Sequence, residues 1–557
     1  MTHPSDFANW DDFLESQGLD FRLAHLELTR ACGTDFLDFI CAFDGKWGMH
    51  NAVPTDVQRA VIAEATALMT PLLEIADSDR RRIAIAQQFG GYVSDLGTSR
   101  ATDWHVRCGG RVPETADDST VEAAFRILAR DFLGFRLLGT THISAVLDGH
   151  PVAKSLFSRF TDDEPLGRLF EEAVAGSAAT GPEALMNAEC PRWAALFPLW
   201  SDGNHSTLQF HTIPGDILNS AVVTKYATID VVEAVQESTI ALLDLARCLS
   251  AGETVTATTY VGLAGLRLED EVQEIGFERI RLRRSTPLDP GCLNGTSQVW
   301  TIAEIDTALR CLDNKVQESS RPGDPPSFAF VERSAEHTEI IEAHHKFLAS
   351  QLERLRFSVL LSSGVEDALA TTATFSTTAN PMTGTATPAR STRPHNSSAH
   401  ELSREIADSL STWLPRVMAM PEHLSLPMRR LLRAAAERDD PVDSLVDAVV
   451  CWEGLFGANP EIKFQVTGAM SVLLEPSDME KRQSLYKVLG DIYGRRSQVV
   501  HGSVEVGARK FTQTDAAEQA QQTVSLGIAA FRAVLESPHL TDESESRLRS
   551  RRILLGF

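Results

Sequence analysis

The sequence predicts a multidomain chain with a mainly α N-terminal region, a mixed or β-rich module and a C-terminal all-α helical bundle. A chain of 557 residues is too long for one hydrophobic core. Apolar residues recur at helical spacing in both end regions, whereas β-branched residues dominate from about residue 254. A stretch rich in Thr, Ser, Ala and Pro precedes the C-terminal region and is typical of a linker.

Residues 1–250 are expected to be mainly helical. The segments "DVQRAVIAEATALMTPLLEIA" from Asp56 and "VEAAFRILARDFLGFRLLG" from Val121 both place apolar residues three and four positions apart. The acidic N-terminus lacks the basic and apolar regions of a secretory signal, and no apolar run reaches the roughly 18 residues that a membrane span needs. We therefore expect a cytoplasmic protein without a membrane partner.

Eight cysteines are scattered along the chain without a C-x-x-C pair, which indicates reduced, mostly buried thiols. The spacing of His105 and Cys108 comes closest to that of metal ligands, but no second pair accompanies it. No P-loop or dinucleotide-binding glycine pattern is found. We expect no metal and no cofactor.

Residues 251–365 are expected to form the mixed or β-rich module, with strand-like segments "TVTATTYVGLAGLRL", "FERIRLRR" and "LRFSVLLSS". Alternation in "FERIRLRR" places Arg279, Arg281 and Arg283 on one strand face. These arginines are candidates for RNA contact. The alternative is a solvated face whose charge is balanced by the nearby acids of "LEDEVQE".

Residues 366–400 are expected to be a flexible linker, residues 401–540 a bundle of five or six helices, and residues 541–557 a charged tail. The breaks between the helices of the bundle are expected at Pro421, Asp439-Asp440-Pro441, Asn459-Pro460 and Pro476. The net charge is −24, but it is unevenly distributed. Residues 401–557 carry 19 basic and 22 acidic side chains, whereas residues 1–400 carry 33 and 54. A surface for a polyanion is therefore more compatible with the C-terminal region.

One helix of that region carries a charge on its apolar face. At about 100° per residue, four apolar residues share one stripe with Arg496, namely Leu485, Leu489, Ile492 and Val499. Burying a guanidinium without partners costs several kcal/mol, so Arg496 requires a polar cleft, a buried acid such as Glu453 or Asp447, or a ligand anion. Arg495 lies about 80° off the stripe and can reach water.

His501 follows Arg496 by five residues, which on one helix separates them by about 140° and about 7.5 Å. The two side chains would not converge within one helix. We expect the helix to end near Gly502 and a second copy of the chain to share the cleft. The alternative for His501 is a favourable interaction with the helix dipole alone.

The segment "YGRRSQVVHG" resembles the signature of ApeA-like HEPN domains, in which Tyr, Arg-Ser and His-Gly recur at this spacing. The upstream segment "PMRRLLRAAAERDDPVDSLVDAVVCWEGLFG" is similar to the same subgroup. Trp452 departs from its pattern, where an aliphatic residue is commoner. The resemblance covers roughly residues 420–535, and its upstream positions are Asp443, Leu445, Val446, Asp447, Glu453 and Leu455.

The resemblance implies a metal-independent endoribonuclease that acts as a homodimer. His501 would transfer protons at cytoplasmic pH, and Arg496 would hold the scissile phosphate. Ser497 would orient the phosphate or the arginine, and Glu453 would fix the direction of the arginine. Tyr493 is a further supporting position, and Arg495 is a candidate for RNA contact.

The resemblance also implies an RNA substrate, with tRNA a candidate, and a role in phage defence or as a regulated toxin. The N-terminal region would then be a sensor or restraint whose trigger the sequence does not name. The alternative is a non-catalytic HEPN module that binds RNA, a nucleotide or a protein partner. A purely structural assembly protein would leave the arginine on the apolar stripe unexplained.

Overall fold

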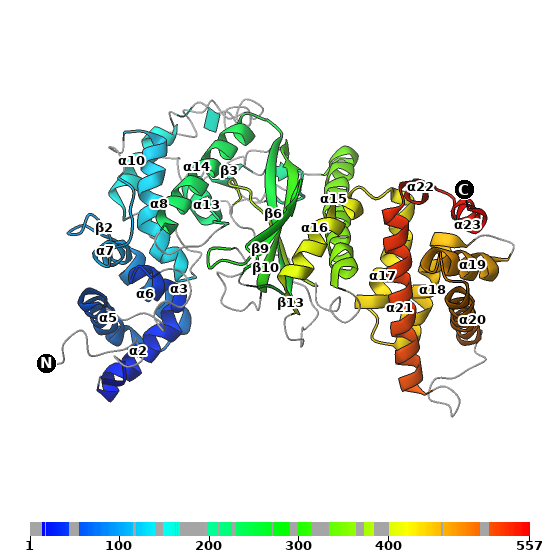
Figure 1. Ribbon diagram of the computed structural model, residues 1–557. Coiled ribbons are helices and arrows are strands. Elements are labelled where there is room, and N and C mark those ends of the chain that lie inside the picture. Colours follow the sequence, from blue (N-terminus) through cyan, green and yellow to red (C-terminus); the bar gives the residue numbers. More distant parts are fainter. Residues whose placement is uncertain are drawn as a thin grey trace.

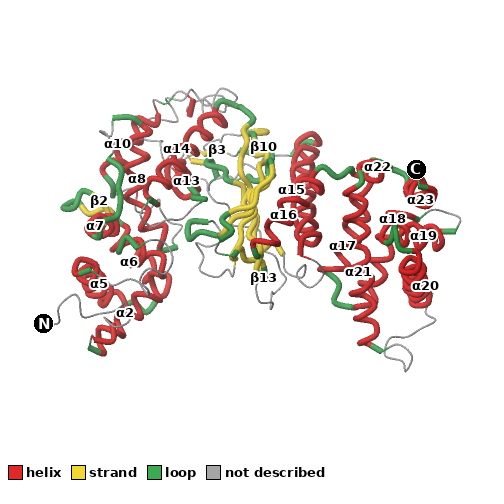
Figure 2. Tube along the Cα trace, in the orientation of Figure 1, coloured by secondary structure: helices red, strands yellow, loops and turns green. Residues whose placement is uncertain are grey.

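The computed structural model shows an elongated, mainly helical molecule with a small antiparallel sheet between two helical regions (Figure 1; Figure 2). The helices α2 (Leu19–Cys32) and α23 (Ser546–Leu555) lie at opposite ends of the molecule (Figure 1). The structure describes residues 14–16, 18–43, 55–114, 119–139, 147, 149–161, 163, 165–166, 195–196, 198–205, 208–209, 212–224, 230–269, 271–289, 299–314, 333–363, 372–383, 400–457, 461–501 and 512–556.

The N-terminal region is helical, as predicted. The helices expected from Asp56 and Val121 begin at these residues, each after a threonine N-cap. Their buried faces join one large apolar core, in which Phe36, Phe89 and Trp104 are fully buried. The helices are α2 (Leu19–Cys32), α3 (Thr34–Ile40), α5 (Asp56–Met69), α6 (Ser78–Gly90), α7 (Arg100–Arg107), α8 (Val121–Leu137), α10 (Pro151–Thr161), α13 (Ile213–Ser220) and α14 (Val231–Ser250).

The central sheet is antiparallel throughout, with strand order β12-β6-β10-β9-β8. Its strands are β6 (Val255–Ala264), β8 (Glu274–Phe277), β9 (Ile280–Arg284), β10 (Val299–Leu309) and β12 (Thr372–Thr378). The β-branched segment expected from residue 254 thus forms β6, which lies between β12 and β10, and, after Gly265, the short β7 (Leu266–Leu268). One sheet face packs on two long helices, α15 (Ala335–Ser363) and α16 (Arg404–Met418).

Helix α15 connects the sheet to the C-terminal bundle. Leu355 and Val359 pack against the sheet, whereas Phe357 and Leu360 belong to the core of the bundle. The prediction of a strand-like segment at "LRFSVLLSS" is wrong, because these residues form the last turns of this 29-residue helix. A short apolar run does not distinguish a strand from a helix that is buried on two sides.

The prediction of a flexible linker is wrong for part of residues 366–400. Thr372–Thr378 pairs with β6 as an edge strand, and β13 (His400–Leu402) pairs in parallel with β7. Without a further strand, the edge of β6 would carry unpaired backbone N–H and C=O groups. The segment "TATFSTT" is rich in threonine, which favours the extended conformation that pairs with such an edge. Residues 366–371 and 384–399 lie outside the described residues.

The described residues between 401 and 537 form six α-helices, and the predicted proline-containing breaks fall between them. The helices after α16 are α17 (Ser425–Ala436), α18 (Pro441–Phe456), α19 (Ile462–Leu474), α20 (Met479–Val500) and α21 (Gln513–Glu536). Their apolar faces form one core around the fully buried Trp452. Trp452, where the HEPN-like pattern favours an aliphatic residue, therefore occupies a packing position.

The prediction of a charged tail is also wrong. Residues after 537 form α22 (Pro538–Thr541) and α23 (Ser546–Leu555), and α23 packs against α18 and α19. Arg549 is 1 % exposed, and its Nε and Nη1 each donate a 2.8 Å hydrogen bond, to the carbonyls of Leu540 and Leu455. This arginine is thus buried in the bundle, where it links α23 to α18 and α22 through hydrogen bonds to their backbone carbonyls.

The sequence also supports predictions about the cysteines and about membrane-spanning segments. None of the six cysteines within the described part of the chain forms a disulfide. In the same residues no helix has the length and apolar character that a membrane crossing requires.

Candidate functional site

The candidate site lies where α20 crosses α18. Asp440 caps α18 by accepting a hydrogen bond from the amide of Val442, and Pro441 occupies the first turn, where its missing N–H costs nothing. Asp478 caps α20 in the same way, through the amides of Glu480 and Lys481. The first residues of both helices are therefore fixed by local capping signals. These starting points determine which residues of α18 and α20 share the face where the two helices meet.

Glu453 on α18 holds two side chains of α20. The Tyr493 hydroxyl donates a 2.6 Å hydrogen bond to Oε1 of Glu453. Nη2 of Arg496 donates to Oε2 at 3.3 Å. Burial and this hydrogen bond raise the pKa of the Tyr493 phenol, which therefore stays protonated as a donor. The sequence allows both Glu453 and Asp447 as partners of Arg496. In the structure the partner is Glu453.

Asp447 is engaged elsewhere. This buried carboxylate accepts 2.7 Å hydrogen bonds from Nη1 of Arg430 and from Nε of Arg438. It therefore stabilises the junction of α17 and α18.

Arg496 retains hydrogen-bonding capacity after its contact with Glu453. Its side chain is 23 % exposed, and its Nε is buried without a hydrogen-bond partner among the described residues. An unpaired buried N–H of a guanidinium costs free energy that a bound anion would recover. Arg496 thus lies at the edge of the apolar stripe, partly neutralised and partly open to a ligand.

His501 is exposed and lies directly at the end of α20, as predicted. Its amide donates a 3.1 Å hydrogen bond to the carbonyl of Ser497, which closes the last turn. No side-chain partner of His501 is found in the described part of the chain. Gly502, the expected residue after the helix end, lies outside the described residues.

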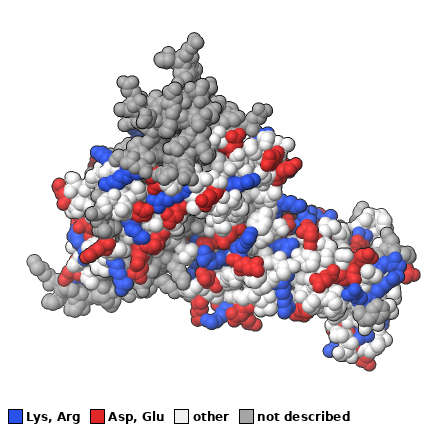
Figure 3. Space-filling model, turned by 90° about the horizontal axis from the view of Figure 1, so that it is seen from above, with Lys and Arg blue, Asp and Glu red and all other residues white. Residues whose placement is uncertain are grey.

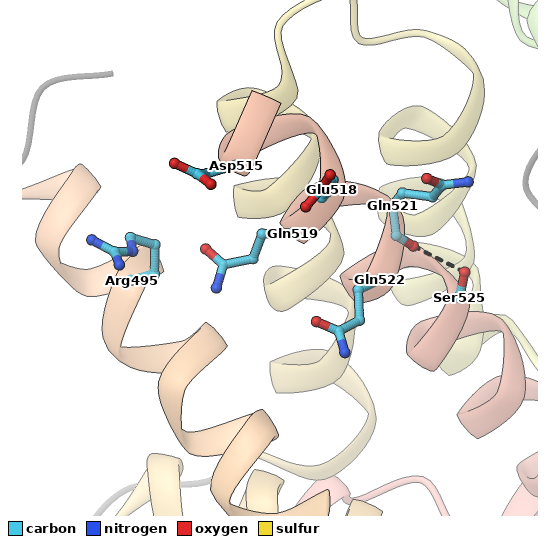
Figure 4. A pocket seen from close by; sticks show the side chains of 7 residues that line it. All are labelled: Arg495, Asp515, Glu518, Gln519, Gln521, Gln522 and Ser525. Carbon is cyan, nitrogen blue, oxygen red and sulfur yellow. Dashed lines mark hydrogen bonds between the residues drawn. The ribbon is translucent and has the colours of Figure 1, made fainter. Parts of the chain in front are cut away.

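Arg495 of α20 lines a polar groove whose other side is formed by α21 (Figure 4). The groove has a volume of about 740 Å³, and its other lining side chains come from the first half of α21. They are Asp515, Glu518, Gln519, Gln521, Gln522 and Ser525. The two adjacent arginines therefore face different helices, Arg496 towards α18 and Arg495 towards α21.

The three arginines expected on one strand face have three different environments. Arg283 is 1 % exposed and ion-paired to Glu304 and Asp289, each at 2.6 Å, so its prediction as an RNA contact is wrong. Arg281 shares Glu304, with a 2.6 Å hydrogen bond from its Nε. Arg279 lies in the turn before β9, is exposed, and has no ion pair within the described residues.

Charged side chains are interspersed over the surface in Figure 3, with acidic and basic groups next to each other along the face in view. No large patch of a single sign stands out among the described residues on this face (Figure 3).

No group of three His, Cys, Asp or Glu side chains that could hold a metal ion occurs among the described residues. His105, the histidine with the spacing closest to that of metal ligands, is fully buried, and its Nδ1 lies 2.7 Å from the carbonyl of Phe39. It is thus a core residue that packs flat against the Phe39 ring.

No family model, no curated protein and no solved structure matches this chain.

The sequence prediction did not include the polar face of α21. Glu518, Gln519, Gln522 and Ser525 recur at three and four spacing, which is the pattern of a polar helix face. That pattern was available in the sequence. What the sequence could not show is that this face lies opposite Arg495.

Proposed function

We propose that this protein is a metal-independent endoribonuclease of the HEPN type that cleaves RNA, with tRNA a candidate substrate. The proposal rests on the resemblance of "YGRRSQVVHG" to ApeA-like HEPN domains. It is supported by the position of that segment, at the end of α20 within an all-helical bundle. Under this proposal the protein acts in phage defence or as a regulated toxin, and residues 1–250 sense a trigger or restrain the nuclease.

One observation carries the proposal. Arg496 is oriented by Glu453 through Nη2, while its buried Nε is unpaired within the described residues. The Arg496 side chain also remains 23 % exposed, so part of its guanidinium stays accessible to a ligand. The proposed chemistry needs both features, a carboxylate that fixes the direction of the arginine and a guanidinium that can reach a phosphate oxygen.

The chemistry follows from the residue types. The 2′-oxygen attacks the adjacent phosphorus as a base removes its proton, and the bond from phosphorus to the 5′-oxygen breaks as an acid protonates that oxygen. Histidine, which titrates near ~6.5, can take either role. Arg496 stabilises the extra negative charge of the pentacoordinate transition state. In a homodimer two His501 side chains supply the base and the acid.

The groove beside Arg495 favours a second candidate, a non-catalytic module that binds RNA, a nucleotide or a protein partner. Its glutamines and carboxylates supply donors and acceptors without a nucleophile or a proton-transfer group. If the protein is such a module, the ion pair between Arg496 and Glu453 is structural, and His501 only interacts with the dipole of α20 at its C-terminal end.

One experiment distinguishes the two candidates. The purified protein is incubated with total cellular RNA, tRNA included, in EDTA, beside the variants His501→Ala and His539→Ala. His539 is an exposed histidine on α22 and serves as the matched control. Fragments ending in 2′,3′-cyclic phosphate are expected from the wild type and His539→Ala alone. Equal cleavage by His501→Ala, or loss of cleavage in EDTA, would contradict the proposed mechanism.

A further inference from the structure

A pocket of about 270 Å³ lies where the N-terminal part of α15 meets the end of β10 and the turn between β8 and β9. It is built from different elements than the groove beside Arg495. Two arginines, Arg279 and Arg310, and one histidine, His344, line it. This is a concentration of positive and donor groups in a protein whose net charge is −24.

The backbone fixes both arginines at the pocket. The amide of Asp306 donates a 2.9 Å hydrogen bond to the carbonyl of Arg279, and the amide of Arg310 donates a 3.1 Å hydrogen bond to Oγ of Ser201. Both side chains are exposed, and neither has an ion-pair partner among the described residues. This distinguishes Arg279 from Arg281 and Arg283, whose guanidinium groups are both bound to Glu304.

His344 contributes an available polar atom. Its Nε2 is buried and has no hydrogen-bond partner in the described part of the chain. Burial lowers the pKa of His344, while the nearby Asp202 carboxylate and a hydrogen bond to the backbone of Ala308 act in the opposite direction. That carboxylate already accepts a 2.8 Å hydrogen bond from Nδ2 of Asn204. A ligand with oxygen atoms would satisfy the buried ring nitrogen at little further cost.

The remaining walls limit the size and chemistry of the ligand. Ser201 and Thr254 present hydroxyl groups, whereas Ile340 and Phe347 of α15 form an apolar side. The volume lies just below the ~300 Å³ at which drug-sized sites begin, which suits a small molecule. Forked guanidinium groups match the oxygens of a phosphate, and an aromatic wall suits an organic group.

We propose that this pocket binds a small phosphate monoester, with its phosphate between Arg279 and Arg310 and its organic group against Phe347. The inference does not depend on the proposed nuclease. It uses residues more than a hundred positions away in the sequence from Arg496.

Calorimetric titration of the full-length protein with phenyl phosphate, inorganic phosphate and phenol tests the proposal. Phenyl phosphate is expected to bind more tightly than inorganic phosphate, and phenol is expected not to bind. Arg279→Ala and Arg310→Ala should each weaken binding about tenfold, because each removes a charge-assisted hydrogen bond. Arg429→Ala, which removes an exposed arginine from α17, should leave binding unchanged.

Three outcomes would overturn the proposal. The first is the absence of phenyl phosphate binding by the wild type. The second is unchanged binding by the double variant Arg279→Ala/Arg310→Ala, since the anion would then bind elsewhere. The third is binding of a short RNA that requires both arginines while phenyl phosphate does not compete. Both arginines are exposed, so thermal unfolding should confirm that the variants fold.

Discussion

The hydroxyl of Tyr493 donates a 2.6 Å hydrogen bond to Glu453, the same carboxylate that holds Arg496 at 3.3 Å. Tyr493 and Arg496 are three residues apart on α20, so they lie on the same helix face and reach one acceptor from adjacent turns. The tyrosine occupies one oxygen of Glu453 and leaves the other for the arginine. The direction of the guanidinium is therefore set by two residues on two helices.

Tyr493→Phe should lower the free energy of unfolding by about 1 kcal/mol, because it deletes one hydrogen bond and leaves the ring in place. The freed carboxylate of Glu453 can then rotate. If the protein cleaves RNA as proposed, the turnover number should therefore fall several-fold while the KM for RNA changes little. Urea denaturation and steady-state cleavage measure the two effects. Loss of stability without any change in turnover would show that the hydrogen bond from Tyr493 has only a structural role.

Glu453→Gln should impair cleavage much more than stability. The amide oxygen still accepts from Tyr493, but the charge that orients Arg496 is lost. The ion pair is partly exposed, so the stability cost should not exceed about 1 kcal/mol. A misdirected arginine should reduce turnover roughly 100-fold. If cleavage is unaffected and only unfolding shifts, Glu453 is a structural partner.

The adjacent arginines provide a matched pair of variants. Arg496→Ala removes the proposed phosphate ligand and should lower turnover at least about 100-fold. Arg495→Ala removes the same charge one position away, in the groove facing α21. It should raise the KM for RNA a few-fold and spare turnover. Both variants should unfold cooperatively near the wild-type midpoint. Equal defects in the two would indicate a general charge effect.

The parts of the fold set by local signals could be predicted from the sequence. The start of α5 at Asp56, the end of α20 at His501 and the proline breaks of the bundle all follow from caps and periodicity. The burial of Arg283 could not be predicted, because one partner, Glu304, comes from a neighbouring strand. Pairing across a sheet is a long-range property.

The same reasoning explains the site. Helical periodicity predicted that Arg496 needs a partner, and it offered Glu453 and Asp447 as candidates. Choosing between them requires the angle at which α20 crosses α18, and no local pattern fixes that angle. The groove facing Arg495 is likewise formed by two helices whose packing is tertiary.

Arg549→Leu tests whether α23 is part of the bundle. The guanidinium donates to the carbonyls of Leu455, Leu540 and Glu543, and its burial lowers its pKa to about 10. Removing it leaves these carbonyls without a donor and should destabilise the protein by about 3 kcal/mol. Arg551→Leu, on the exposed side of α23, should change the free energy of unfolding by less than about 0.5 kcal/mol. Equal, small effects of both variants would restore the charged-tail interpretation.

Asp216 on α13 should make stability depend on pH. Burial raises the pKa of its carboxyl to about 7, and a hydrogen bond from Thr212 acts in the opposite direction. In the unfolded chain the same carboxyl titrates near ~3.9. Between these values the folded state binds more protons than the unfolded state. The contribution of Asp216 to stability is therefore full below about pH 4 and is lost as the pH rises through about 7.

Asp216→Asn removes this dependence, because an amide does not titrate. The difference in free energy of unfolding between wild type and variant should therefore shift in favour of the variant as the pH rises from about 4 to 8, by up to about 4 kcal/mol. Urea denaturation of both proteins at several pH values measures this difference, and the other carboxyls cancel in the comparison. A difference that stays constant with pH would mean that the Asp216 carboxyl is ionised in the folded protein throughout this range. In that case its environment would contain a cation or donors that compensate for its burial.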